Sequence, residues 1–349
     1  MTIKMKRLIL SLAITLTAVA ATYAQDYNDQ WLAKQIAYTS VEEALSNADK
    51  AEVLDLSNQG ISSLPADIAQ LKNLKAIYIQ GNTLTTLPPQ LFQLTELRFI
   101  FADQNAIARI PGEVAGLKKL KRISLANNRI SEMAQLTNCT QLESATLSNN
   151  LITVIPATIS NMKSLKELDL SFNKITAFQG ALTNLKDLEV LMLAGNTIAS
   201  LPTTVANFKS LKVLYLDNNK IRDMTQICNI TTLTRLSLSG CGLMSVPTRI
   251  SQLYNLQRLI LSHNSLTTVP TDITTLTSLV FLDLSNNRLT RLPNEVVKFE
   301  NLYDLNLCNN LFAQFPELLQ NLPALKAIGV SGNRTQMVPP MLGYERDVY

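Results

Sequence analysis

Apolar residues recur along almost the whole chain in the pattern LxxLxLxxNxLxxLPxxLxxL, as in "LVFLDLSNNRLTRLPNEVVKF" at residues 279–299. The first position of the pattern is filled thirteen times, and successive copies lie 23 residues apart except for two steps of 22. A period of this length is typical of stacked structural units. The first positions are Ala51, Leu74, Leu97, Leu120, Leu142, Leu165, Leu188, Leu211, Leu233, Leu256, Leu279, Leu302 and Leu325.

Each repeat, numbered from that first residue, has apolar side chains at positions four and six. This alternation predicts one short strand per repeat, with both side chains in the core. Because every repeat runs in the same direction, the strands should form one parallel sheet. In "LRFIFADQN", residues 97–105, this register places Ile100 and Ala102 inside. Phe99 and Phe101 then face outward, whereas a shift of one residue would bury both of them.

Position nine is Asn in eleven repeats, and Gln59 and Cys241 are the exceptions. An amide side chain both donates and accepts hydrogen bonds, so it can satisfy backbone groups where the chain turns off the strand. We call this column the asparagine ladder. Its members are Asn82, Asn105, Asn128, Asn150, Asn173, Asn196, Asn219, Asn264, Asn287, Asn310 and Asn333.

Ten of the 13 prolines occupy one equivalent position of the repeat, where the chain should cross the outer side without regular helical hydrogen bonds. Repeats four, six and eight have Ala134, Gln179 and Thr225 there instead. We expect the outer segments of these three repeats to be more helical.

The two ends of the chain depart from the repeat. Residues 1–24 have a basic start, an apolar run and small residues before Ala24, which predicts a cleaved signal peptide. The apolar run is shorter than the roughly 20 residues that span a membrane, so we expect no membrane insertion after cleavage. Residues 25–50 should form a helical N-terminal cap, with a capping box at Ser40 and Glu43. Residues 51–340 are the repeat domain, and residues 341–349 are a short tail.

The formal net charge of +4 comes mostly from the leader. Removing three of the 31 basic residues and none of the 27 acidic ones leaves a net charge of +1. Acidic and basic residues also alternate on the predicted strands. No field of a single sign would attract nucleic acid or a membrane surface, so neither is an expected partner.

The four cysteines, Cys139, Cys228, Cys241 and Cys308, fall at unrelated positions of the repeat. Side chains on different sides of a coil lie too far apart for a disulfide, so buried thiols are favoured over disulfide bonds. An even number of cysteines in an exported chain would otherwise suggest disulfides.

The sequence offers little evidence for a catalytic, metal-binding or phosphate-binding site. His263 is the only histidine, and it occupies a position that is Asn or Gly in several other repeats, so we interpret it as a turn residue. A catalytic triad with Ser262 and Asp283 is disfavoured because no nucleophile elbow or oxyanion loop is present. No cluster has the spacing of metal ligands, and no Gly-rich phosphate loop occurs. The sequence predicts no enzyme activity, metal or cofactor.

The repeats resemble leucine-rich repeat proteins of the 23-residue class with Leu-Pro on the convex side. The resemblance implies an α/β fold, a right-handed leucine-rich repeat solenoid shaped as a horseshoe or arc. Its parallel sheet would line the concave face, with irregular, 3-10 or helical segments on the convex face. Such proteins usually bind other macromolecules on the concave face. Extracellular eukaryotic members typically have cysteine-paired caps, which this chain lacks, so it is more similar to bacterial exported or surface members. Its expected location is therefore periplasmic, cell-surface or secreted.

Positions three and five point out of the predicted sheet, where folding does not require apolar residues. Aromatic and arginine residues nevertheless gather there, and such side chains dominate binding hot spots. The first group surrounds Phe99 and Phe101 and is the favoured binding site. A second group contains Val190 and Val213, and a looser third follows it in the later repeats. The predicted binding residues are Tyr78, Arg98, Phe99, Phe101, Arg122, Met192, Tyr215, Arg235, Arg258, Ile260, Phe281 and Tyr303.

These residues suggest a non-catalytic exported module that binds a protein on its concave face. The alternative is recognition of a carbohydrate such as a cell-wall glycan through the same aromatic rings. The outward groups could also be ordinary strand-forming residues, or could pack in a homodimer. We expect a monomer or a weak dimer.

Overall fold

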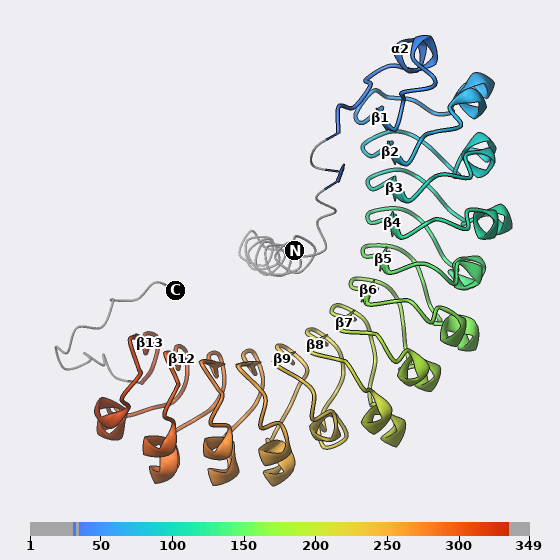
Figure 1. The fold of residues 1–349 in the computed structure, drawn as a ribbon. Coiled ribbons are helices and arrows are strands. Elements are labelled where there is room, and N and C mark those ends of the chain that lie inside the picture. The colour runs from blue at the N-terminus through green and yellow to red at the C-terminus, as the bar shows by residue number, and fades with distance from the viewer. Residues whose placement is uncertain (1–30, 33–34, 335–349) are drawn as a thin grey trace.

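The computed structural model describes residues 31, 32 and 35–334. In this part of the chain, thirteen parallel strands pair in chain order into one open sheet. Figure 1 shows the result as an arc, with the sheet along the inner side and short helices along the outer side. The predicted solenoid with a concave parallel sheet is confirmed.

Each strand covers positions three to five of its repeat. Equivalent positions pair directly, as in Val53↔Ala76 and Phe99↔Arg122, so each position forms a column that runs across the sheet. The strands are β1 (Val53–Asp55), β2 (Ala76–Tyr78), β3 (Phe99–Phe101), β4 (Arg122–Ser124), β5 (Ser144–Thr146), β6 (Glu167–Asp169), β7 (Val190–Met192), β8 (Val213–Tyr215), β9 (Arg235–Ser237), β10 (Arg258–Ile260), β11 (Phe281–Asp283), β12 (Asp304–Asn306) and β13 (Ala327–Gly329).

The outer side of the coils is built from 3-10 helices, which begin directly after the repeat proline wherever it is present in the described residues. They are η2 (Ala66–Gln70), η3 (Pro89–Gln93), η4 (Gly112–Gly116), η5 (Ala134–Asn138), η6 (Ala157–Asn161), η7 (Gly180–Asn184), η8 (Thr203–Asn207), η9 (Ile227–Asn229), η10 (Thr248–Gln252), η11 (Thr271–Thr275), η12 (Asn294–Lys298) and η13 (Glu317–Asn321).

The prediction that the outer segments of the three repeats without proline are more helical is wrong. The segments η5 and η7 are five-residue 3-10 helices like most of the others, and η9 has only three residues. Each outer segment packs between the segments before and after it, so it stays short whether or not proline is present.

The asparagine ladder forms as predicted, and Asn196 is representative. Its Nδ2 donates to Leu193 O at 2.9 Å in its own coil and to Leu170 O at 3.0 Å in the preceding coil. Its Oδ1 accepts from the Ile175 N–H at 2.9 Å. All eleven asparagines repeat this arrangement of donors and acceptors. Each amide therefore links two consecutive coils. Neighbouring members share acceptors, since Leu170 O accepts from both Asn173 and Asn196.

Position eight, directly before the ladder, adopts a left-handed backbone in every repeat of the described chain. Glycine and asparagine tolerate this conformation best, which explains why they fill most of these positions. His263 occupies the same position with φ of 54°. Its interpretation as a turn residue is confirmed.

The N-terminal end is closed by one short helix, α2 (Val41–Ser46). The Ser40 Oγ accepts from the Glu43 N–H at 3.1 Å, so one bond of the predicted capping box is present. The Glu43 carboxylate accepts from the N–H of Thr39, one residue before the N-cap, at 3.4 Å. Before it, Tyr38 forms a parallel bridge with Leu54 and extends the edge of the sheet. Among the described residues of the segment 25–50, the α-helix covers only Val41–Ser46, and Tyr38 pairs beside β1 instead of joining the helix.

Three predicted segments lie wholly or partly outside the described residues: the signal peptide 1–24, the first residues of the cap and the tail 341–349. Within the described residues, no helix has the length and apolar character needed to cross a bilayer.

Candidate functional site

A row of stacked side chains lies on the concave face of β2, β3 and β4. The rings of Tyr78 and Phe101 are nearly parallel, with centroids 4.6 Å apart and an interplanar angle of 10°. The Arg122 guanidinium carbon lies 6.0 Å from the Phe101 centroid, within the range of a cation–π contact. The row forms because Tyr78 and Phe101 are paired in register. Arg98, at position two of the same region, is exposed.

Phe99 is buried, with only 6% of its surface exposed. The ring of Trp31 stacks over it at 6.3 Å and 14°, and the Lys75 Nζ lies 5.1 Å from the Trp31 ring on this face. Leu32 and Ala37 pack against the same cluster. We call residues 31, 32 and 35–38 the N-terminal strap. The prediction of an exposed Phe99 is wrong, because the chain's own strap lies over this part of the concave face.

The second predicted group is also largely buried. Val190, Val213 and Tyr215 pack together on β7 and β8, with Met192 half-buried beside them. Tyr215 is only 5% exposed, so the prediction that it stands exposed is wrong. Bulky side chains in equivalent positions of adjacent strands lie close enough to cover one another.

The third group is the most open of the three. The Arg258 guanidinium carbon lies 3.6 Å from the centroid of the Phe281 ring, on the neighbouring strand. Tyr303 is 52% exposed at position two, and the equivalent Val280 is 43% exposed. Ile260 and Arg235 are half-buried. The structure thus brings the predicted residues of β10 and β11 together as a surface.

Sequence reasoning missed two aspartates that accept hydrogen bonds from the next coil, of which Asp217 is buried and Asp103 is half-buried. Asp217, at position seven, accepts hydrogen bonds from the Ser237 hydroxyl and, at 2.8 Å, from the Ser239 N–H in the next coil. Asp103 makes the same two bonds to Ser124 and Ala126. The available signal was Asp at position seven followed by Ser at position five of the next repeat.

Burial raises the pKa of Asp217 from 3.8 to about 6, although its hydrogen bonds from Ser237 and Ser239 oppose the shift. The folded state therefore holds this proton more tightly than the unfolded state. Its contribution to stability is full below pH 4 and is lost as the pH rises through 6.

We expect Asp217→Asn to stabilise the protein at pH 7 by up to about 3 kcal/mol, since a two-unit shift corresponds to that difference. The amide is neutral and its oxygen can accept the same two hydrogen bonds. Urea unfolding at pH 4 and pH 7 measures the effect, which should be much smaller at pH 4. The exposed Asp187→Asn is the control. Equal gains at both pH values would contradict the assignment.

Three leucine-rich repeat families together match most of the repeat domain. The "Leucine-rich repeat region" family matches residues 52–150, and the "Leucine Rich repeats (2 copies)" family matches residues 140–186 and 186–229. The "Leucine rich repeat" family matches residues 231–289 and 277–334. This chain is a leucine-rich repeat protein. None of the matched families is enzymatic, and leucine-rich repeat domains generally mediate protein–protein interactions.

Solved structures of other leucine-rich repeat proteins resemble this one. A leucine-rich repeat protein of Leptospira interrogans is 26% identical with a TM-score of 0.61, over 87% of this chain and 95% of that one. An internalin from Listeria monocytogenes is 23% identical with a TM-score of 0.75, over 84% of each chain. The Toll–Spätzle complex of Drosophila is 23% identical with a TM-score of 0.72, over 83% of this chain and 42% of that one. The last two likenesses show the fold alone. No curated protein matches the sequence.

The cysteines of this leucine-rich repeat chain are four free, buried thiols, as predicted. Burial raises the pKa of the Cys228 and Cys241 thiols to about 12. Both are therefore un-ionised and poorly nucleophilic at neutral pH. Among the described residues, no group of three or more His, Cys, Asp or Glu side chains is arranged to hold a metal ion.

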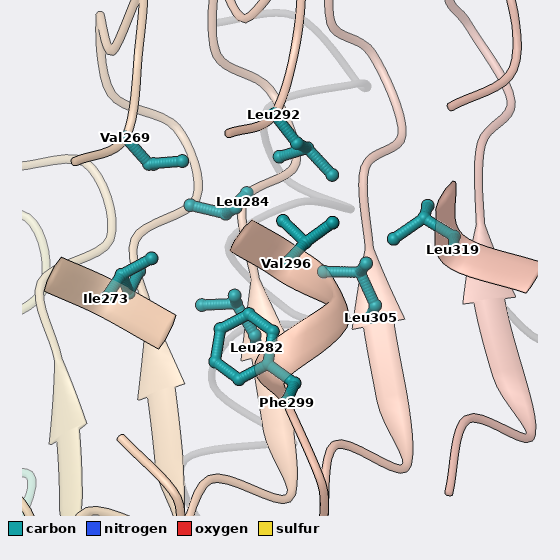
Figure 2. A pocket seen from close by; sticks show the side chains of 9 residues that line it. All are labelled: Val269, Ile273, Leu282, Leu284, Leu292, Val296, Phe299, Leu305 and Leu319. Atoms are coloured by element: carbon teal, nitrogen blue, oxygen red, sulfur yellow. The ribbon is translucent and has the colours of Figure 1, made fainter. Parts of the chain in front are cut away.

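A small cavity lies inside the leucine-rich repeat core between β11, β12 and the outer helices (Figure 2). It has a volume of about 10 Å³, which is room for about one water molecule. Its lining is entirely apolar, so it offers no polar group to orient a ligand. It is a packing defect formed by Val269, Ile273, Leu282, Leu284, Leu292, Val296, Phe299, Leu305 and Leu319.

We expect Val296→Ile to stabilise the protein by up to about 0.8 kcal/mol, the value of one buried methylene group, because its extra carbon can enter this cavity. Val205→Ile, at the equivalent position of repeat seven, is the control and should overpack the core instead. Thermal unfolding compares the two. An equal gain in both variants would show that the cavity is not the cause.

Proposed function

We propose that this leucine-rich repeat chain is an exported, non-catalytic module that holds a protein partner on its concave sheet. One observation carries the proposal: arginine–aromatic contacts stand on the outward columns of that sheet, at Phe101–Arg122 and at Arg258–Phe281. Folding does not require such side chains outside the core. They are also the residue types that contribute most at binding interfaces.

The size of the sheet supports a macromolecular partner. With strands roughly 4.8 Å apart, thirteen of them form a face on the order of 60 Å long. A standard protein interface needs roughly 800 Å² on each partner, which is a fraction of such a face. The Toll–Spätzle structure, which is similar in fold, is a complex, and this is in line with a macromolecular partner here.

Carbohydrate recognition is the second candidate, and ring geometry weakens it. A sugar ring would pack on the open face of an aromatic side chain. Tyr78 and Phe101 use faces on each other, Arg258 lies over Phe281, and Trp31 lies over Phe99. One face of each ring is therefore already occupied, which leaves less ring surface for a sugar. A protein side chain can use the ring edges and the adjacent guanidinium groups, so a protein partner is favoured.

Export rests on the leader at residues 1–24, whose basic start, apolar run and small residues before Ala24 are those of a signal peptide. The internalin and the Leptospira protein are bacterial chains with the same architecture, which supports a bacterial origin. Mass spectrometry of the protein from its producing cells tests cleavage directly. An N-terminus at Gln25 is expected, and an intact leader would contradict export by this route.

Affinity capture tests the binding function. Residues 25–349 are immobilised and exposed to bacterial and host extracts, and a glycan array is probed in parallel. A captured protein should bind the double variant Tyr78→Ala, Tyr303→Ala more weakly than it binds the unaltered chain. The control is Val154→Ala, an exposed apolar residue outside the strand columns. Glycan binding without any protein partner would favour the second candidate. If Val154→Ala weakens binding of the partner and the double variant does not, the partner does not bind the concave face.

A further inference from the structure

The two ends of the concave face differ in what lies on them. At β1, β2 and β3 the N-terminal strap packs on Val53, Ala76 and Phe99. At β11 and β12, large apolar side chains remain open to solvent, because Val280 and Tyr303 are 43% and 52% exposed. Sequence reasoning favoured the first end as the binding site. The structure points to the other end.

The charge pattern changes between the same two ends. All five ion pairs among the described residues lie between Glu52 and Lys212. Four of them join side chains at position two of neighbouring coils, as in Lys212–Glu189 at 2.9 Å. From the ninth to the twelfth repeat the same column continues as Thr234, Gln257, Val280 and Tyr303, and it ends at Lys326. Over these four repeats the paired charges are thus replaced by neutral and apolar groups.

Arg258 stands at the edge of this neutral region and makes no ion pair within the described residues. Its guanidinium group is held 3.6 Å above the Phe281 ring. Stacking occupies the face of the guanidinium and leaves its in-plane N–H groups to donate. This fork matches the two oxygens of a carboxylate. Arg235 lies beside Arg258 in register on β9.

We infer that Gln257, Arg258, Ile260, Val280, Phe281 and Tyr303 form a docking surface for a partner protein segment that presents a carboxylate beside an aromatic or aliphatic side chain. The inference rests on the proposed function and specifies its site and partner chemistry. The carboxylate pairs with the Arg258 guanidinium. The neighbouring apolar side chain packs on Val280 and Tyr303. We call these six residues the arginine–aromatic surface.

Nearby acidic residues favour a protein segment over a polyanion. Asp283 is paired in register with Ile260, and Asp304 of β12 is paired in register with Phe281 of β11. A nucleic acid or an anionic membrane would bring many phosphates against these carboxylates. A single carboxylate on a peptide can reach Arg258 without approaching them, so charge complementarity is local.

The test uses the full mature chain, residues 25–349, and a phage-displayed library of random twelve-residue peptides. Enriched peptides should contain Asp or Glu within a few residues of Phe, Trp, Tyr or Leu. Their affinities are then measured by fluorescence anisotropy for the unaltered chain and for Arg258→Ala, Arg258→Lys and Tyr303→Ala. We expect Arg258→Ala and Tyr303→Ala each to weaken binding about tenfold or more. Arg258→Lys should weaken it less, because it keeps the charge but loses the planar fork.

Controls separate this inference from the general function. Arg222→Ala removes an exposed arginine outside the strand columns and should leave affinity unchanged. Binding should weaken with salt, and Arg258→Ala should reduce that salt dependence. Peptides sensitive to Phe101→Ala and Arg122→Ala, but not to the Arg258 or Tyr303 variants, would overturn the inferred site and leave the proposed function standing. Enrichment of basic peptides, or no enrichment by a chain with a native circular dichroism spectrum, would overturn the partner chemistry. If none of the concave-face variants changes the peptide affinity, the inferred site and the proposed function are both contradicted.

Discussion

Replacing Asn196 by alanine should lower the free energy of unfolding by roughly 2–6 kcal/mol. The Ile175 N–H loses its hydrogen-bond acceptor, which costs about 1–3 kcal/mol for a buried group. Leu170 O and Leu193 O each lose one of two hydrogen bonds, at about 0.5–1.5 kcal/mol each, and keep the bonds from Asn173 and Asn219. Asn196 is 5% exposed, so water cannot readily replace the lost bonds. Urea unfolding followed by circular dichroism measures the change.

Cys241 provides a matched control because it fills the same ladder position in repeat nine. Its thiol lies 3.2 Å from Leu216 O, a weaker contact than an amide hydrogen bond. Cys241→Ala should therefore cost only about 1 kcal/mol. Each coil contacts only its neighbours, so a broken link at Asn196 could also separate the unfolding of the two halves into two transitions. Equal losses at Asn196 and Cys241 would show that the ladder hydrogen bonds are not the cause.

Replacing Phe99 by alanine should destabilise the protein by about 3–5 kcal/mol and release the N-terminal strap. The range is that of a buried phenylalanine truncated to alanine. Trp31 is the only tryptophan in the chain, so its fluorescence reports directly on the strap. When the Phe99 ring is removed, Trp31 loses its stacking partner and its emission should shift to longer wavelength. Acrylamide should then quench it more strongly.

Phe101 is the matched control for this experiment. It lies two residues away on the same strand and faces the same side, but its ring stacks on Tyr78. Phe101→Ala should cost less stability, because Phe101 is only half-buried, and it should leave the Trp31 emission almost unchanged. If Phe99→Ala does not move the emission either, the strap does not rest on Phe99 in solution.

The N-terminal strap also explains why the structure favours a different binding site from the one that the sequence favoured. Phe99 looked like a surplus apolar residue on an outward position, and its direction was predicted correctly from the repeat. Its exposure was not, because Trp31 covers it from 68 residues away in a segment that has no repeat. Arg258 and Phe281 belonged to the loosest of the predicted groups, yet their guanidinium and ring lie in direct contact.

The sequence alone determined the repeat register, the direction of every strand, the buried positions and the asparagine ladder. These features repeat in each coil, and a coil can bury its apolar face and satisfy its backbone only against an identical neighbour. The tertiary structure decided which outward residues remain accessible. That outcome depends on contacts outside the period: the strap on Phe99, the packing around Tyr215 and the pairing of Arg258 with Phe281. A repeating pattern cannot specify contacts that occur only once.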